Sequence, residues 1–115
     1  MKTITKDMSW QDIAAIAQTH REETIARLNP PVPDPPADLP LNLTSLPAKL
    51  LPKDVIEITE SPVERLLHQM ATGKLTSTQV TQAFLQRAGL ASKLVNCITE
   101  PVSYTHLTLP TILRV

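Results

Sequence analysis

The sequence predicts a mainly α-helical chain with four parts: an N-terminal helix (1–28), a Pro-rich extended strap (29–60), a helical hairpin plus a short strand (61–101) and a tail (102–115). Ser or Thr followed three residues later by Asp, Glu or Gln precedes each stretch that carries apolar residues at helical spacing. Eight of the eleven prolines lie within residues 29–52. The 115 residues include one Trp, one Tyr and one Phe. Because large side chains usually dominate core packing, we expect these elements to belong to a larger core than their own.

The charge balance disfavours some classes of partner. Eleven Lys plus Arg equal eleven Asp plus Glu, so no net attraction toward nucleic acid or an anionic membrane is expected. No window approaches the ~20 apolar residues of a membrane span, and the first ten residues have no apolar leader core. The single cysteine, Cys97, cannot form an internal disulfide and is expected to be a small buried hydrophobe in a reducing compartment. These observations favour a soluble cytoplasmic protein.

The first helix is predicted within residues 8–28. Ser9 is placed to cap it with Asp12 at N3, a capping box in which Asp replaces the usual Glu or Gln. His20 fits a boundary position better than a metal site, because no second His, Cys or carboxylate pattern accompanies it. The predicted packed face consists of Trp10, Ile13, Ile16, Ala17, His20, Ile25 and Leu28.

The strap follows from its prolines. Proline fixes φ, lacks an amide donor and disfavours helix at the preceding residue, so the segment should be extended and polyproline-like. The stretch "PPVPDPP" has the P-x-x-P spacing of ligands for aromatic-lined domains, but the flanking arginine of such ligands is not adjacent. Interleaved leucines favour a strap lying on a protein surface: Leu39, Leu41, Leu43, Leu46, Leu50 and Leu51.

A helical hairpin is predicted over residues 61–89. For its first helix the sequence provides Ser61 as N-cap, Pro62 at N1 and Glu64 at N3, and Gly73 is placed to end the helix in a left-handed conformation. Thr76 as N-cap with Gln79 at N3 begins the second helix. The predicted buried faces are Val63, Leu66, Leu67 and Met70 in the first helix, and Val80, Ala83, Phe84 and Ala88 in the second.

The stretch "KLVNCIT", residues 93–99, is rich in β-branched residues and predicts a strand or an extended edge.

No residue of the chain is predicted to be catalytic, cofactor-binding or metal-binding. The serines, at positions 9, 45, 61, 77, 92 and 103, are explained as caps, turns or surface residues, and no lysine pairs recognisably with one. His68 fits the polar edge of its helix. Cys97 has no histidine nearby in sequence that could activate its thiol.

Three blocks of sequence together resemble a known family. They are "W-x-x-IAA-x-AQ…R-x-ETI", "LPLNLTSLPAKLLPKDVIEITES" and "ATGKLTSTQVTQAFLQRAGLASKLVNCITE". In order and spacing they resemble the N-terminal region of fungal amidases of the amidase-signature family, including the acetamidase-like enzymes. The resemblance covers residues 8–100, and its G-x-x-(T/S) turn, "RA" and N-x-(I/L/V)-T positions are Gly73, Thr76, Arg87, Ala88, Asn96, Ile98 and Thr99.

The resemblance implies a parent enzyme with a mixed sheet flanked by helices. Such enzymes hydrolyse small linear amides to acid and ammonia or amine through a Ser–cis-Ser–Lys triad, with no metal or cofactor; homo-oligomerisation of the full-length parent is left open. The family places its lysine and its Gly/Ser-rich loop farther along than the matched segment. The glycines of this chain, Gly73 and Gly89, belong to no such loop. The chain is therefore expected to be inactive by itself.

The last residues depart from the family pattern. The stretch "VSYTHLTLPT", residues 102–111, resembles the translation of a sequencing adapter, so residues 102–115 are interpreted as a non-native tail. A genuine β-prone tail is the alternative, because alternating Thr and Leu also suits a strand. Resequencing the locus across codon 101 distinguishes the two.

A second hypothesis belongs to another class of protein, a stand-alone helical interaction module. Its hairpin would present an apolar face to a partner groove or helix. The residues of that face would be Val63, Leu66, Leu67, Val80 and Phe84.

Overall fold

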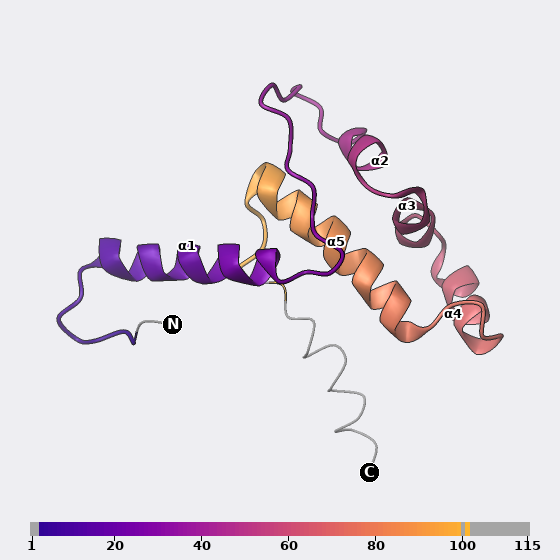
Figure 1. Cartoon of the computed structure of the whole chain (residues 1–115), viewed down its shortest axis with the longest axis horizontal. Helices are drawn as coiled ribbons and strands as arrows, with labels where there is room; N and C mark the ends of the chain where they lie inside the picture. The colour runs from indigo at the N-terminus through magenta and orange to yellow at the C-terminus, as the bar shows by residue number, and fades with distance from the viewer. Residues whose placement is uncertain (1–2, 100, 102–115) are drawn as a thin grey trace, which may run out of the picture.

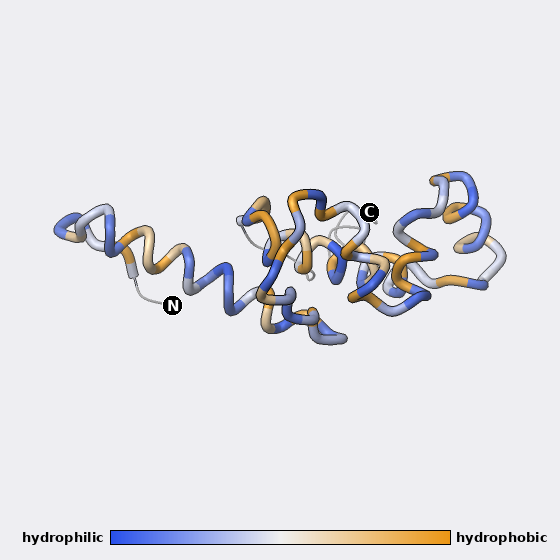
Figure 2. The backbone as a smooth tube through the Cα atoms, turned by 90° about the horizontal axis from the view of Figure 1, so that it is seen from above, coloured by the Kyte–Doolittle hydropathy of each residue, from blue (hydrophilic) through white to orange (hydrophobic). Residues whose placement is uncertain are grey.

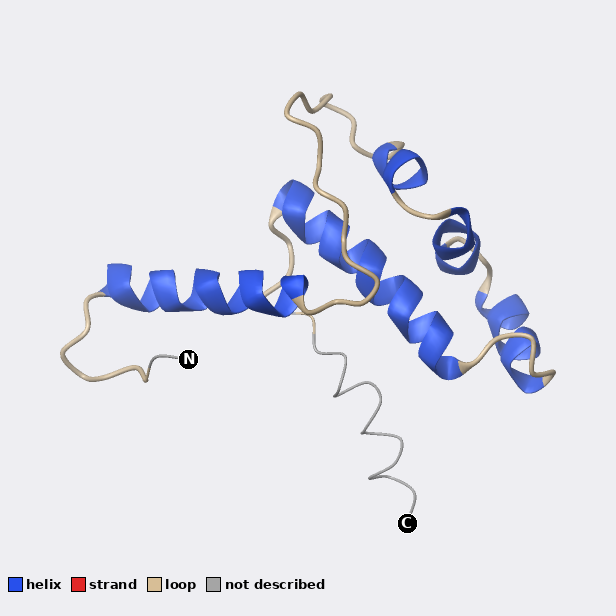
Figure 3. Cartoon of the chain, in the orientation of Figure 1, coloured by secondary structure: helices blue, strands red, loops and turns tan. Residues whose placement is uncertain are grey.

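The computed structural model describes residues 3–99 and 101, and these residues contain helices and no strand (Figures 1 and 3). The helices are α1 (Trp10–Ala26), α2 (Leu46–Leu50), α3 (Lys53–Thr59), α4 (Val63–Ala71) and α5 (Ser77–Val95). The mainly α-helical character predicted from the sequence is confirmed. The segment predicted to be a non-native tail, 102–115, lies outside the described residues.

Helix α1 begins where the capping signal predicts. The backbone N–H of Asp12 donates to Ser9 Oγ at 3.3 Å, and the backbone N–H of Ser9 donates to Asp12 Oδ2 at 3.2 Å, which completes the capping box. These bonds satisfy amide groups that have no partner inside the helix.

The predicted packed face of α1 is only partly correct. Ile25 is the buried residue of the helix and Leu28 is buried just after it, whereas Trp10 is 74% exposed and Ile13 is exposed. The reason is geometric, because α1 extends away from the other helices and only its C-terminal end joins them. Both Figure 1 and the view from above in Figure 2 show this arrangement.

The strap is shorter than predicted. Residues 31–43 contain neither helix nor strand, but α2 and α3 occupy much of the remaining stretch to residue 60. Pro47 lies in the first turn of α2 and Pro52 is the N-cap of α3. A helix tolerates proline at these places because their amides have no intrahelical partner. The prolines therefore begin these two helices instead of excluding them.

The core forms where α5 packs against α3 and where the start of the strap crosses α5. Leu90 of α5 is completely buried at its centre. The close crossing depends on Gly89, since a Cβ built there would lie 2.8 Å from Val32 Cγ2. The buried members of this cluster are Ile25, Leu28, Val32, Leu51, Val55, Ala83 and Leu90.

The capping box predicted for α4 is wrong. The helix begins at Val63 with Pro62 as its N-cap, and no side chain caps it. The Ser61 hydroxyl instead donates to the carbonyl oxygen of Glu57 in α3. Because α3 ends immediately before Ser61, its unpaired carbonyl groups lie within reach of this hydroxyl.

The turn between α4 and α5 agrees with the sequence prediction. Gly73 has φ +80°, and the N–H of Lys74 donates to the carbonyl oxygen of Gln69 at 2.9 Å, as in a Schellman motif. Helix α5 then starts with the predicted capping box. The N–H of Gln79 donates to Thr76 Oγ1 at 3.1 Å, and the N–H of Thr76 donates to Gln79 Oε1 at 2.8 Å.

The buried faces predicted for the hairpin need correction. In α4, Leu66 is buried, Met70 is half-buried, and Val63 and Leu67 are exposed. In α5, Ala83 is buried, Val80 and Ala88 are half-buried, and Phe84 is exposed. The physical reason is that α3, and not α4, is the main helix packed on α5, so the two helices do not bury a shared face.

The prediction of a strand or an extended edge over residues 93–99 is wrong for residues 93–95, which are helical, and residues 96–99 form no strand. Helix α5 continues to Val95, and Asn96 ends it with φ 53°. Among the described residues there is no strand with which this segment could pair, and the burial of Leu90 and Ser92 holds the last turns of α5 in helical form. Helix contacts therefore outweigh the β propensity of single residues.

Candidate functional site

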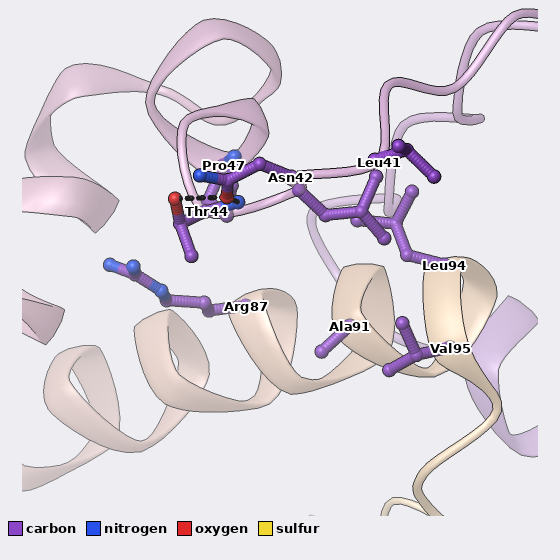
Figure 4. A pocket seen from close by; sticks show the side chains of 9 residues that line it. Leu41, Asn42, Thr44, Pro47, Arg87, Ala91, Leu94 and Val95 are labelled. Carbon is purple, nitrogen blue, oxygen red and sulfur yellow. Dashed lines mark hydrogen bonds between the residues drawn. The ribbon is translucent and has the colours of Figure 1, made fainter.

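A groove lies between the loop that precedes α2 and the C-terminal half of α5, and its cavity volume is about 610 Å³. Figure 4 shows Leu41 from the loop on one side and Ala91 and Val95 from α5 on the other. Most of the lining side chains are aliphatic. The groove residues are Leu41, Asn42, Leu43, Thr44, Pro47, Arg87, Ala91, Leu94 and Val95.

The loop wall of the groove is held by a local side-chain turn. Asn42 Oδ1 accepts from the backbone N–H of Thr44 at 3.0 Å. It also accepts from the Thr44 hydroxyl at 2.6 Å, the bond drawn in Figure 4. Such bonds fix a turn without help from a helix or strand. The loop therefore reaches α2 in a defined conformation.

Arg87 brings the one charged side chain of the groove lining, and that charge is paired within the chain. Its Nη1 donates to Thr59 Oγ1 at 2.8 Å and lies 3.3 Å from Glu60 Oε1. These bonds tie α5 to the end of α3. The groove therefore combines an apolar surface with a neutralised guanidinium.

A second set of bonds holds the strap on α5. Lys93 Nζ donates to Asp34 Oδ1 at 2.8 Å and to the carbonyl oxygen of Val32 at 3.2 Å. The hydrogen bond and the positive charge of Lys93 hold the pKa of Asp34 below its ordinary value. Because an ion pair with an exposed partner contributes little, the burial of Val32 is the larger stabilising contact.

Gln86 contributes a third contact to the strap. Its Nε2 donates to the carbonyl oxygen of Pro31 at 3.3 Å. Its Oε1 is buried and accepts no hydrogen bond from the part of the chain that the structure describes. The Gln86 side chain therefore bonds to the strap through its amide nitrogen and not through its amide oxygen.

The serines are engaged in local structure and form no nucleophile–base pair that the structure shows. Ser9 caps α1, Ser77 is the first residue of α5, and Ser45 precedes α2 in an exposed position. The Ser92 hydroxyl donates to the carbonyl oxygen of Ile98 at 3.5 Å. Because Ser92 is buried, its predicted position in a cap, a turn or the surface is wrong. Ser103 lies outside the described residues.

Among the described residues, His20, His68 and Cys97 do not form a cluster. His68 is exposed, and His20 is half-buried beside a cavity of about 580 Å³ that Asp12 and Glu23 also line. Cys97 is exposed, so the expectation of a buried thiol is wrong, because the chain leaves α5 before this residue instead of entering a sheet. Within residues 3–99 and 101, no group of three or more His, Cys, Asp or Glu side chains could hold a metal ion.

The groove was not predicted from the sequence as a site. The leucines of the strap did indicate contact with a protein surface, and two of them, Leu41 and Leu43, line it. In the sequence, Arg87 stood out only as part of the family pattern.

No helix among the described residues is long and apolar enough to cross a membrane.

Comparison with known proteins finds amidases of fungi. The chain is 38% identical over 95 residues to an acetamidase of Aspergillus oryzae. The aligned part covers 77% of this chain and 16% of that protein. It is 34% identical over 101 residues to an acetamidase of Emericella nidulans, with coverages of 80% and 17%. It is 36% identical over 103 residues to a Schizosaccharomyces pombe protein whose name places it among the amidases, with coverages of 81% and 18%.

The chain thus spans less than a fifth of the length of these curated relatives. No protein-family model matches the chain. No solved structure matches it.

Proposed function

We propose, from the membership of this chain in the acetamidase-like amidases of fungi, that it forms the N-terminal part of an enzyme that hydrolyses linear carboxylic amides. The observation that supports this proposal is the similarity to two acetamidases over more than three quarters of the chain. The matched part covers 16%, 17% and 18% of the three relatives, so most of the proposed enzyme lies outside it.

In the proposed reaction a serine hydroxyl attacks the amide carbonyl carbon, and the C–N bond breaks to release ammonia or an amine. Water then cleaves the acyl–serine ester to give the carboxylic acid. A lysine acting through a second serine takes the proton from each nucleophile and returns it to the leaving group, and backbone amides stabilise the oxyanion. This is the amidase-signature mechanism, and it uses neither metal nor cofactor.

The described residues contribute structure to this proposal and no reacting group. Ser9, Ser61 and Ser92 each make a hydrogen bond within a cap, a turn or the packed interior. Lys93 is bonded to the strap. The catalytic serines and lysine are therefore assigned to the part of the enzyme that the relatives have beyond this segment.

Two forms of the protein test the proposal. We expect the complete reading frame to release ammonia from acetamide or another short aliphatic amide in an assay coupled to glutamate dehydrogenase, with no loss after treatment with a chelator. Residues 1–115 alone should release none. Turnover by the 115-residue chain would refute the assignment of the catalytic groups. A complete protein that hydrolyses no linear amide would refute the function.

The same proposal places the enzyme in the cytoplasm, with a small amide as its binding partner and no nucleic acid. The equal numbers of acidic and basic residues support the second part, since phosphate backbones attract basic surfaces. Self-association of the complete enzyme is tested by sedimentation. Fluorescence microscopy of the tagged complete protein tests its location.

A further inference from the structure

The groove between the loop and α5 presents apolar side chains that the described residues leave uncovered. Leu41 is fully exposed on the loop side, and Val95 is 58% exposed on the α5 side. Covering these side chains would remove their apolar surface from water, which is favourable. We therefore expect another group to cover the two facing aliphatic walls of the groove.

The walls of this groove are already in place. The Asn42–Thr44 turn fixes the loop, and Lys93 holds the strap that leads into it. On the other side α5 is anchored by the complete burial of Leu90 in the core. A largely preformed site lowers the cost of ordering its walls on binding.

The lining restricts the chemistry of the occupant. Aliphatic side chains dominate, and the guanidinium of Arg87 already has Glu60 as its ion-pair partner. A charged occupant would lose hydration in this groove without gaining a free counter-charge among these residues. An uncharged, apolar segment fits the lining best.

We propose that the groove is the docking site for an apolar segment of the same polypeptide, supplied by the larger part that the amidase relatives have beyond the length matched here. This inference rests on the proposed function. Its main support is length, because the matched segment is at most 18% of each of the three relatives compared.

Position and linkage favour this occupant over a second molecule. Val95 lines the groove and is the last residue of α5, so the chain leaves the helix beside the groove. A covalently joined segment experiences an effective concentration on the order of millimolar. A second copy at micromolar concentration would compete poorly with it.

Cysteine accessibility tests the inference in both forms of the protein. Leu41→Cys and Val95→Cys are introduced separately in a Cys97→Ser background, and labelling with a maleimide is followed by mass spectrometry. Asp38→Cys, on an exposed part of the strap outside the groove, is the matched control. Any other cysteine of the complete protein is located by peptide mapping.

We expect both groove cysteines to react quickly in the 115-residue chain and at least tenfold more slowly in the complete protein. The control should react at similar rates in both. Equal rates for the groove cysteines in the two forms would overturn the inference. Protection could instead appear in the 115-residue chain and rise with the concentration of that chain. This result would assign the groove to a second copy and would also overturn the inference.

The outcome is separable from that of the proposed function. Amide hydrolysis by the complete protein is measured on the same preparations before labelling. Protection without hydrolysis would leave the docking site in place and reject the reaction. Hydrolysis without protection of the groove cysteines would support the reaction and reject the docking site.

Discussion

Gly89 is the position at which a single methyl group is expected to disturb the contact between the strap and α5. A Cβ at this residue would lie 2.8 Å from Val32 Cγ2 and 2.9 Å from Leu28 Cδ1. Carbon atoms in favourable contact are ~3.5–4.0 Å apart, so the added methyl group overlaps both neighbours. The Gly89→Ala substitution therefore forces one of them to move.

Two effects of opposite sign decide the size of the change. Alanine is favoured over glycine inside a helix by about 1 kcal/mol. Overpacking a core typically costs about 1–3 kcal/mol. The side chain of Val32 is short and stiff, so it cannot easily move away from an added methyl group. Gln86 and Lys93 donate to the carbonyl oxygens of Pro31 and Val32, so the strap backbone is also held in place. We expect a net destabilisation of about 1 kcal/mol.

Urea unfolding followed by circular dichroism measures the change, and amide hydrogen exchange around Leu90 measures the same contact locally. Gln82→Ala, at an exposed position of α5, is the control and should change the free energy of unfolding by less than about 0.5 kcal/mol. Adding Val32→Ala to Gly89→Ala should cost less than the sum of the two single changes. Stabilisation by Gly89→Ala alone would refute the close crossing.

Three further predictions follow from local contacts. Thr76→Ala removes the cap of α5 and should lower the free energy of unfolding by about 1 kcal/mol in urea titrations; no change would contradict the cap. Because Lys93 lowers the pKa of Asp34, the stabilisation from this pair is present at neutral pH and is lost as the pH falls through the lowered pKa. An NMR titration should show the pKa of Asp34 rising toward its ordinary value in Lys93→Gln, and identical titrations would refute the contact. Cys97 should react at once with a thiol reagent in the folded chain, whereas slow reaction would mean that it is buried.

The sequence predicted the features that depend on neighbouring residues. Ser9 with Asp12 and Thr76 with Gln79 mark real helix starts, and Gly73 adopts the left-handed conformation expected after α4. Each of these depends on bonds within one or two turns of the chain. The pattern that resembles fungal amidases was likewise readable without coordinates, and the similarity to acetamidases confirms it.

The candidate groove could not be found in this way, because its walls come from segments more than forty residues apart. Leu41 and Val95 come to line the same groove only after the strap has crossed α5. The crossing in turn depends on the missing side chain of Gly89 and on the burial of Val32. Spacing along the chain carries no information on such a contact.

The sequence by itself therefore determined where two helices start, where α4 ends and which family the chain resembles, since caps, turns and motifs are local. The tertiary structure decided that α3 and not α4 packs on α5, that Trp10 and Phe84 remain exposed, and that residues 93–95 continue a helix. The physical reason is that burial depends on what lies across the fold. A periodic apolar pattern shows which side chains can pack together and does not identify their neighbour.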